Sequence, residues 1–386
     1  MLEKKVKEKL HVYRKYRKFG NWGQGDLSLD NRSPMILSTP RVRFDERGNK
    51  CYINFQKMRT NRQMNLFSLV ALRSSTNINP CIWQAGLMGA KARRLLNEPT
   101  FAGEVLAALP TSIYLLGKNG EIIWVTLDGL PMHRRCLQAS FQPGSLRVKQ
   151  AFFIREASLR IGEGVAIELD RAREWEPPAI PEGKAESLTV VNARLRRLLS
   201  ALPALGKGEG LGQAIPLISA IMAGDGVGTP MINSLIARAS STILGVGRAM
   251  LDQDITQVAR IGKDLVGLGP GLTPSGDDFL GGMLFAAHFL KMTYPEDFYW
   301  EDGVVRDLID WARTRTNPIS HAVLHDLALG YGPGPLHEVV RSLLMGHDLE
   351  CLMAAVARLL RIGHSSGWDI LAGLLTGMLM VSGRMS

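Results

Sequence analysis

The sequence of 386 residues contains only four cysteines, and no two of them form a C-x-x-C pair. They are Cys51, Cys81, Cys136 and Cys351. Such wide spacing excludes a zinc knuckle and a disulfide framework. Because unpaired cysteines are typical of reducing compartments, we expect a cytoplasmic protein.

Long hydrophobic runs are also missing. No stretch reaches the roughly 20 apolar residues that a membrane-spanning helix needs. The best candidate, residues 370–381, is 12 residues long and contains glycine, which suits a buried helix. Residues 1–20 are charged throughout and lack the apolar core of a signal peptide. We therefore expect no membrane association.

Most of the chain has no excess of charge of either sign. The formal net charge is +10, but residues 1–63 carry 16 Lys and Arg against 6 Asp and Glu, whereas residues 64–386 carry 30 of each. The basic segment 1–63 is either an arm for nucleic acid or an anionic surface, a solvated tail, or an upstream extension. Because it contains no recognisable binding module, we favour a tail or extension over nucleic-acid binding.

The hydrophobic fraction of 46% is enough for a sizeable core, and its pattern changes along the chain. Residues 112–116 and 121–125 flank a Gly/Asn turn and predict a β-hairpin, and residues 151–154, 159–161 and 165–169 predict further strands. A proline-rich stretch at 177–181 then predicts a linker.

From about residue 185 the apolar residues recur at helical spacing. Helices are predicted over 188–202, 231–251, 255–266, 279–290, 304–312, 336–345, 349–362 and 368–381. The expected fold is α+β, with a smaller β-rich N-terminal domain and a larger, nearly all-helical C-terminal domain. The predicted domains are a poorly ordered extension at 1–63, a β-rich domain at 64–178 and a helical domain at 179–386.

The most unusual stretch is GLGPGLTPSGDDFLGG at residues 267–282, whose first ten residues include four Gly and two Pro. Ser275 is predicted at the N-cap of an apolar helix, with Asp277 and Asp278 in its first turn. A capped helix after a loop is enough to explain the serine and the two aspartates. The glycine content exceeds that need, and glycines before a helix N-terminus let backbone N–H groups approach an anion. The motif is neither a P-loop nor a dinucleotide fingerprint.

An internal echo strengthens this motif. SGDDFLGG at residues 275–282 and SGWDILAG at residues 366–373 share five of eight residues. The pattern predicts two equivalent helix N-termini around one site, with Asp278 and Asp369 in matching positions. The alternative is that serine–glycine helix starts recur by chance.

Four other features are weaker candidates. His321 and His325 share a helical face but lack the Glu of H-E-x-x-H, so a zinc site is disfavoured. Residues 224–230 predict a helix connection, or a third wall of the site. Residues 316–320 predict an N-cap, with Thr316 or Ser320 facing a ligand as the alternative. Steering of an anionic substrate is one hypothesis for the adjacent residues Arg134 and Arg135.

The glycine-rich motif, followed by TNPIS and GHSSGWDILAG, resembles a bacterial family named for the oxamate carbamoyltransferase subunit AllH. The runs SIYLLGKNGEIIWVTLDG and IELDRAREWEPP are also similar to that family, so the resemblance covers roughly residues 64–384. Residues 1–63 lie outside it, which favours an extension there.

The resemblance implies one subunit of a three-part system of allantoin breakdown, with a synthetase-like protein among its partners. The implied reaction moves a carbamoyl group between oxalurate and phosphate, giving oxamate and carbamoyl phosphate. Both substrates are anions, and the tetrahedral intermediate is charged, so backbone donors at two helix N-termini suit this chemistry.

We infer the residue roles from this chemistry. The residues expected to bind the anion are Gly269, Gly271, Thr273, Ser275, Gly276, Ser365, Ser366 and Gly367. Proton transfer is assigned to Asp277, Asp278 or Asp369, with His364 as a further acid or donor. Asp277 and Asp278 are also the candidate ligands of a divalent metal such as Mg²⁺. Ser275 is disfavoured as a nucleophile because no neighbouring base is evident.

Two other classes of function remain open. The chain is either a carbamoyltransferase subunit, a non-catalytic assembly subunit whose loop docks a partner, or a nucleic-acid-binding protein that uses its basic arm.

Overall fold

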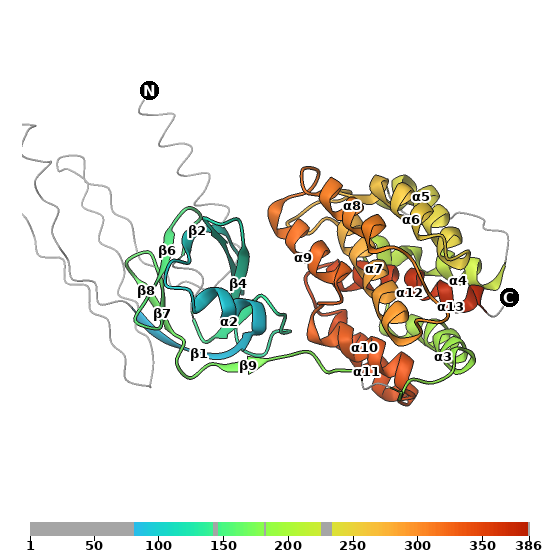
Figure 1. The fold of residues 1–386 in the computed structure, drawn as a ribbon, viewed down its shortest axis with the longest axis horizontal. Coiled ribbons are helices and arrows are strands. Elements are labelled where there is room, and N and C mark those ends of the chain that lie inside the picture. The colour runs from blue at the N-terminus through green and yellow to red at the C-terminus, as the bar shows by residue number, and fades with distance from the viewer. Residues whose placement is uncertain (1–80, 142–145, 181–182, 225–233, 385–386) are drawn as a thin grey trace, which may run out of the picture. The chain divides into compact units, whose positions relative to one another are not determined.

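The computed structural model describes residues 81–141, 146–180, 183–224 and 234–384 (Figure 1). Strands occupy the chain from Cys81 to Trp175, and helices dominate from Leu188 to Gly383. The predicted α+β fold, β-rich first and helical second, is therefore confirmed. The basic segment 1–63, and with it the nucleic-acid hypothesis, lies outside the described residues. The predicted domain limits stay predictions.

The strands form a closed sheet. Its strands are β1 (Cys81–Gly89), β2 (Ala102–Ala108), β3 (Ser112–Gly117), β4 (Ile122–Thr126), β5 (Cys136–Ala139), β6 (Ala151–Arg155), β7 (Ser158–Ile161), β8 (Val165–Glu168) and β9 (Arg173–Trp175). Their order is β5-β4-β3-β2-β6-β7-β8-β1-β9, and β1 also pairs with β5. This last pairing closes eight strands into a barrel, so that β1 pairs along both of its edges.

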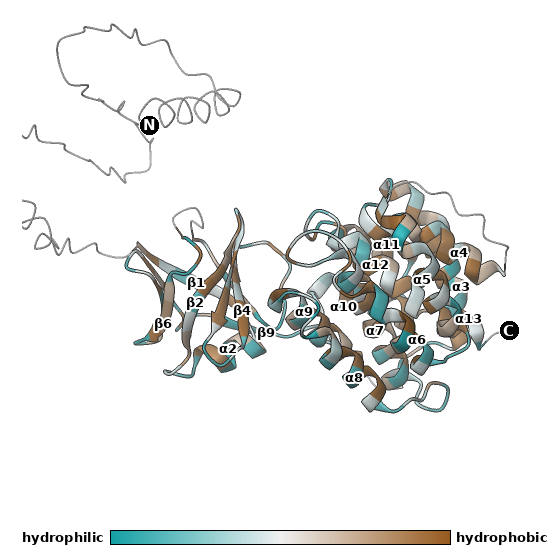
Figure 2. Ribbon diagram, turned by 90° about the horizontal axis from the view of Figure 1, so that it is seen from above, coloured by the Kyte–Doolittle hydropathy of each residue, from teal (hydrophilic) through white to brown (hydrophobic). Residues whose placement is uncertain are grey.

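The long first strand makes closure possible. Residues 81–84 of β1 pair in parallel with β8, and residues 87–89 pair in parallel with β9. On its other edge β1 runs antiparallel to β5, with an irregularity between Ala85 and Leu87. Such a bulge bends a strand, as barrel closure requires. Figure 2 shows apolar residues along β1, β2 and β4, and the buried ones fill the barrel.

The predicted hairpin is confirmed as β3 and β4, which pair antiparallel from Ser112–Thr126 to Leu116–Ile122. Gly120 has φ of 81° in the turn, a left-handed conformation that glycine adopts without strain. The later predicted strands are β6, β7 and β8.

The helices begin with a short one in the barrel, α2 (Ala90–Leu96). The others are α3 (Leu188–Ala201), α4 (Ile215–Ala223), α5 (Ser234–Leu251), α6 (Ile255–Gly262), α7 (Ser275–Thr293), α8 (Asp302–Ala312), α9 (Pro318–Ala328), α10 (Gly334–Met345), α11 (Leu349–Leu359), α12 (Ser366–Gly377) and α13 (Leu379–Gly383). Among the described residues, no helix combines the length and the apolar character required for crossing a membrane.

Three of the differences between the observed and the predicted helices have a clear physical reason. Helix α4 was not predicted because its nine residues are almost uniformly apolar, so no periodicity marks them. The expected helix over 368–381 is two helices, α12 and α13, which meet near Gly377. The expected helix over 349–362 ends earlier, at Leu359, before a turn that contains Gly363.

Helices α7 and α12 lie side by side in the helical region (Figure 1). In α12 all residues but the first are buried, and α7 is buried from Ser275 to Ala287, so that both contribute to the main hydrophobic cluster of this region. A helix that is apolar all round is expected in such a place. The two copies of the repeated motif therefore start two helices that pack against each other inside the helical region.

Candidate functional site

The glycine-rich loop spans residues 267–274 and leads into α7. Gly267, Gly269 and Gly271 have φ of 75°, 119° and 100°. A side chain is strained in this region of φ, so the alternate positions of the loop depend on glycine. A Cβ at Gly269 would also come within 2.8 Å of the backbone nitrogen of Ser275, whereas Gly271 faces open space.

Several amides of this loop point to a binding role. Among the described residues, the backbone N–H groups of Gly269, Gly271, Leu272 and Thr273 have no hydrogen-bond acceptor. Gly271 is exposed and Thr273 is half-buried. Unsatisfied amides in backbone of alternating handedness form concave anion sites in other proteins. Gly269, Gly271 and Thr273 belong to the predicted anion site, which stays a prediction.

The start of α7 differs from the prediction by one position. Pro274, not Ser275, is the N-cap, and its carbonyl accepts hydrogen bonds from the N–H groups of Asp277 at 2.9 Å and Asp278 at 3.1 Å. Ser275 is the first helical residue, and its side chain is buried. Because it lies inside the helix, its hydroxyl is directed to α12 rather than to its own first turn.

The matching glycines of the two copies allow their helices to touch backbone to backbone. A Cβ at Gly282 of α7 would overlap the carbonyl oxygen of Ile370, and a Cβ at Gly373 of α12 would overlap that of Phe279. Gly282 and Gly373 occupy equal positions in the echo, as do Phe279 and Ile370. The contact is therefore reciprocal, and the echo corresponds to a structural repeat.

The second residues of the two copies also play equal parts. A Cβ at Gly276 would overlap the carbonyl oxygen of Leu265, and one at Gly367 would overlap that of Leu359. The N–H of Gly276 bonds to Leu268 at 2.8 Å, and that of Gly367 bonds to Ile362 at 3.0 Å. Both amides are thus occupied within the chain, and both glycines provide close packing.

The serines and aspartates exchange partners between the copies. The hydroxyl of Ser366, at the start of α12, interacts with the carboxyl group of Asp278 on α7. In return, the hydroxyl of Ser275 interacts with the carboxyl group of Asp369 on α12. Thr273 of the glycine-rich loop joins this group through its hydroxyl, 3.0 Å from that of Ser366. Asp278 and Asp369, which the echo places in matching positions, lie close enough for the charge of one to act on the other, and their shared site stays a prediction.

Asp278 is the most unusual carboxyl group of the set. It is buried, and its Oδ2 atom has no hydrogen-bond partner among the described residues. Burial raises its pKa well above the ordinary value, and the charges of Asp369 and Asp277 raise it further against the opposing effect of Ser366 and Thr273. An unsatisfied buried carboxyl group costs stability, so it calls for a functional explanation.

Asp369 is buried as well, but it is better satisfied. Its Oδ1 accepts the N–H of Leu211 at 2.6 Å, and its Oδ2 accepts the hydroxyl of Ser365 at 2.9 Å. Burial raises its pKa to about 6 despite these bonds and those from Ser275 and Gly212. Asp369 therefore holds the segment around residues 210–212 against α12 and keeps a proton more easily than an ordinary aspartate.

Asp277 has a different environment although it is the next residue. Its Oδ1 accepts the N–H of Gly267 at 2.7 Å, and its Oδ2 accepts the hydroxyls of Ser320, at 2.6 Å, and Thr316. Both oxygens are thus occupied by donors. The arrangement ties the glycine-rich loop to the start of α9, which points to a positioning role rather than proton transfer.

The remaining candidates are spread more widely. His364 is almost fully exposed, with its Nδ1 at 3.8 Å from Glu209. His321 bonds to the carbonyl of Ile309 at 3.1 Å, and its ring centroid is 6.4 Å from that of His325. Within the described ranges, no group of three or more His, Cys, Asp or Glu side chains is placed to hold a metal ion.

Residues 316–320 do form the start of a helix, as predicted. Asn317 caps α9 by accepting the N–H of Ser320 at 3.0 Å. The hydroxyls of Thr316 and Ser320 bond to Asp277 instead of facing a ligand. Of the connection at 224–230, only Gly224 lies within the described residues, where it ends α4 in a left-handed conformation.

The hypothesis that Arg135 steers a substrate is disfavoured, because Arg135 is buried. Its guanidinium donates to both oxygens of Asp326 on α9, at 2.6 and 2.8 Å, and to Glu121 at 3.0 Å. Arg134 lies over the ring of Tyr331, 3.6 Å from the centroid. The prediction treated both as surface residues because their partners lie almost 200 positions away.

Sequence reasoning also missed a tyrosine near the site. Tyr114 of β3 is mostly buried, and the charge of Asp278 contributes to raising its pKa to about 12, although burial is the larger cause. Leu272 of the glycine-rich loop packs in the same small apolar cluster as Tyr114. The only available signal was its place in a strand, which does not specify what that strand contacts.

The comparison with known families bears on this region. Residues 265–378 match the family described as oxamate carbamoyltransferase subunit AllH. The segment is AllH-like. It contains the glycine-rich loop, both copies of the repeated motif and helices α7 to α12. We call residues 265–378 the AllH segment.

The resemblance expected from the motifs is thus confirmed for the AllH segment, a narrower range than the predicted 64–384. The description of this family supports the expectation that the chain is a subunit of a carbamoyltransferase system. No solved structure matches the chain.

Proposed function

We propose that the chain is a subunit of an enzyme that moves a carbamoyl group between oxalurate and phosphate, with its site at the N-termini of α7 and α12. The observation that carries this proposal is the reciprocal pairing of the two copies, which brings Asp278 and Asp369 together inside the AllH segment.

The glycine-rich loop would bind the anionic groups. Oxalurate and phosphate are both anions, and the amides of Gly269, Gly271, Leu272 and Thr273 are available to them. Amides fixed by the loop backbone need no reorganisation when charge develops on the tetrahedral intermediate. The half-buried hydroxyls of Thr273, Ser365 and Ser366 already interact with one another and with Asp278 and Asp369, so they would hold the two carboxyl groups in place beside the loop.

Asp278 is our candidate for proton transfer. In the forward direction, an oxygen of phosphate forms a bond to the carbamoyl carbon, and the bond from this carbon to the amide nitrogen of oxalurate breaks. The departing nitrogen takes a proton and becomes the amide of oxamate. Burial raises the pKa of Asp278 and so favours its protonated form, which is suited to donate a proton. Carbamoyl phosphate is the other product.

The other predicted residues would support this step. Asp277 fixes the loop through Gly267 and α9, and Asp369 raises the pKa of Asp278 through its charge. His364 is exposed beside Glu209 and would serve as a second donor at the entrance. A divalent cation such as Mg²⁺ does not fit this arrangement, because both oxygens of Asp277 are already bonded, Asp278 is assigned the proton, and the described residues hold no cluster of three metal ligands.

The test is the phosphate-dependent cleavage of oxalurate by the full chain, co-purified with the subunits that assemble with it, including the expected synthetase-like protein. Carbamoyl phosphate formation is compared for the wild type, Asp278→Asn and Asp264→Asn. Asp264 is a matched control because it is an exposed aspartate just before the motif. We expect loss of turnover only in Asp278→Asn.

The same experiment separates the enzyme from an assembly subunit. If Asp278→Asn assembles and turns over normally while deletions in the loop prevent assembly, the loop docks a partner and the assembly role stands. This alternative draws on the same structure, because Asp277 and Asp369 are both satisfied within the chain.

A further inference from the structure

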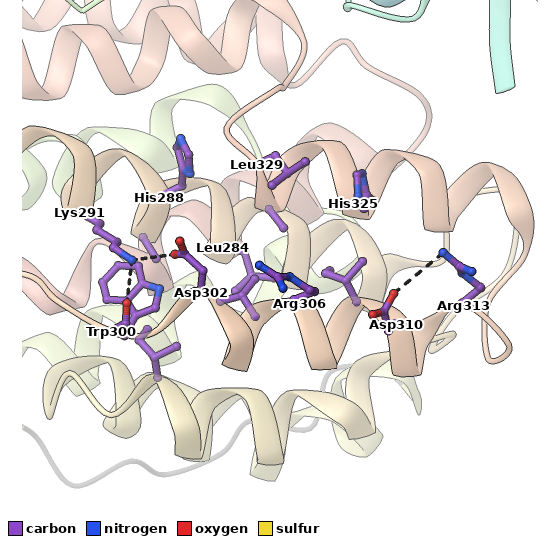
Figure 3. A pocket seen from close by; sticks show the side chains of 15 residues that line it. Leu284, His288, Lys291, Trp300, Asp302, Arg306, Asp310, Arg313, His325 and Leu329 are labelled. Atoms are coloured by element: carbon purple, nitrogen blue, oxygen red, sulfur yellow. Dashed lines mark hydrogen bonds and ion pairs between the residues drawn. The ribbon is translucent and has the colours of Figure 1, made fainter. Parts of the chain in front are cut away.

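A pocket of about 450 Å³ lies between α7, α8 and α9, away from the glycine-rich loop (Figure 3). Its α7 residues, Leu284 to Lys291, come nine to sixteen positions after Ser275. At 1.5 Å per residue, this places them roughly 14 to 24 Å along the helix from its N-terminus. The pocket is therefore a second concave site, separate from the proposed carbamoyl-transfer site.

The floor of the pocket is apolar. It is formed by Leu284, Ala287, Val305, Ile309, Ala328 and Leu329. Leu329 is 48% exposed, so it lies at the edge of this floor, where the pocket opens to solvent. The volume falls in the range of roughly 300 to 1,000 Å³ that is typical of small-molecule sites. Such a floor favours the hydrocarbon part of a ligand.

The charges around the mouth do not balance. Lys291 bonds to Asp302 at 2.7 Å and to the carbonyl of Trp300 at 2.7 Å, and Arg313 lies 3.9 Å from Asp310. These two pairs, drawn as dashed lines in Figure 3, account for both carboxylates of the lining. One permanent cation is left over.

That cation is Arg306. It forms no hydrogen bond or ion pair with any described residue, and Figure 3 shows it without a dashed line between the two pairs. It does act over a longer range, since its charge helps to lower the pKa of Asp302. Burial lowers the pKa of His288, which disfavours its charged form. His325 has its Nδ1 at 3.5 Å from Asp326.

We propose that this pocket binds a small organic monoanion, with its carboxylate on Arg306 and its apolar body on the floor between Leu284 and Leu329. A guanidinium presents donors in a fork that fits a carboxylate, and an apolar floor beside it selects a short acyl or aryl carboxylate over inorganic phosphate. This inference does not depend on the proposed carbamoyl transfer.

The probe is hexanoate, and hexanamide is its uncharged counterpart of the same size. Titration calorimetry with the full chain is expected to give a Kd for hexanoate of about 1 mM or below. Hexanamide is expected to bind at least about tenfold more weakly, since it lacks the charge that Arg306 recognises.

Three variants locate the site. Arg306→Gln is expected to weaken hexanoate about tenfold and to leave hexanamide unchanged. Leu329→Trp narrows the mouth at a position exposed enough to accept the larger ring, and should weaken both probes. Arg248→Gln is the matched control, an exposed arginine near the end of α5, and should affect neither.

The proposal is overturned if hexanoate gives no binding heat at millimolar concentrations. It is equally overturned if hexanamide binds as tightly as hexanoate, or if Arg306→Gln weakens hexanoate no more than Arg248→Gln does. Unchanged circular dichroism of each variant establishes that a loss of binding is not a loss of fold.

Discussion

Gly282 of α7 lies directly against the carbonyl oxygen of Ile370 of α12, with no room for a side chain between them. The same relationship, with the copies exchanged, joins Gly373 to the carbonyl of Phe279. This double contact fixes how α7 and α12 cross, and so fixes the distance between the carboxyl groups of Asp278 and Asp369.

Substituting either glycine by alanine should therefore destabilise the protein. We expect Gly282→Ala and Gly373→Ala each to lower the free energy of unfolding by about 1–3 kcal/mol, as overpacking does. Urea denaturation measures this. Gly303→Ala in α8 is the matched control, since open space surrounds that glycine, and it should be neutral or stabilising by about 0.5–1 kcal/mol. Equal effects at Gly282 and Gly303 would contradict the close contact.

The neighbouring aspartates of the motif should respond in opposite ways. In Asp277→Asn one carboxylate oxygen becomes an NH₂ group, which faces hydrogen-bond donors and cannot accept from them. This change should lower the free energy of unfolding by about 1–3 kcal/mol. Asp278→Asn replaces a buried carboxyl group that has an unpartnered oxygen by a neutral amide of the same shape, and should cause no loss of stability at pH 8. Urea denaturation of both variants measures the two free energies of unfolding. An equal decrease in both variants would show that Asp278 has a structural role.

Asp369 should give the stability a specific pH dependence. Its pKa is raised from 3.8 to about 6 in the folded protein, so the folded state binds more protons between these values. The stabilisation that Asp369 contributes to the folded state is therefore complete below pH 3.8 and is lost as the pH rises to about 6. Relative to wild type, Asp369→Asn should become progressively more stable over this window and level off above it. A difference that does not change with pH would contradict the raised pKa.

The buried pair of Arg135 and Asp326 should be strongly coupled. Both side chains are buried, so removing one leaves the charge of the other without a partner. Arg135→Met or Asp326→Leu alone should therefore lower the free energy of unfolding by about 3–5 kcal/mol. The double variant should cost clearly less than the sum of the two singles, because it leaves no unpaired charge. Additive losses in a denaturation double-mutant cycle would show that the pair contributes no specific coupling.

Local sequence patterns predicted the elements well and the contacts poorly. The glycine-rich loop, the helix that follows it and the two aspartates of its first turn are local features, and the structure has them. The exchange of partners between Ser275 and Asp369 is not local, since 94 positions separate them. The echo in the sequence was the one signal that these distant residues meet.

The different roles of Asp277 and Asp278 illustrate what local sequence patterns cannot predict. Successive residues of a helix point about 100° apart. One of these carboxyl groups therefore faces the start of α9 and the other faces α12. Both orientations are compatible with the same sequence, and only the packing of α9 and α12 distinguishes them. Arg135 was misjudged for the same reason, because Asp326 lies 191 positions away.

The central claim is that the paired helix starts form a catalytic site with Asp278 as its proton donor. The most direct test is the rate of carbamoyl phosphate formation from oxalurate and phosphate by the assembled complex containing Asp278→Asn. The account predicts a fall in turnover of at least about 100-fold, the usual contribution of a general acid, with assembly and stability unchanged. Turnover within a factor of two of wild type in the assembled variant would contradict it.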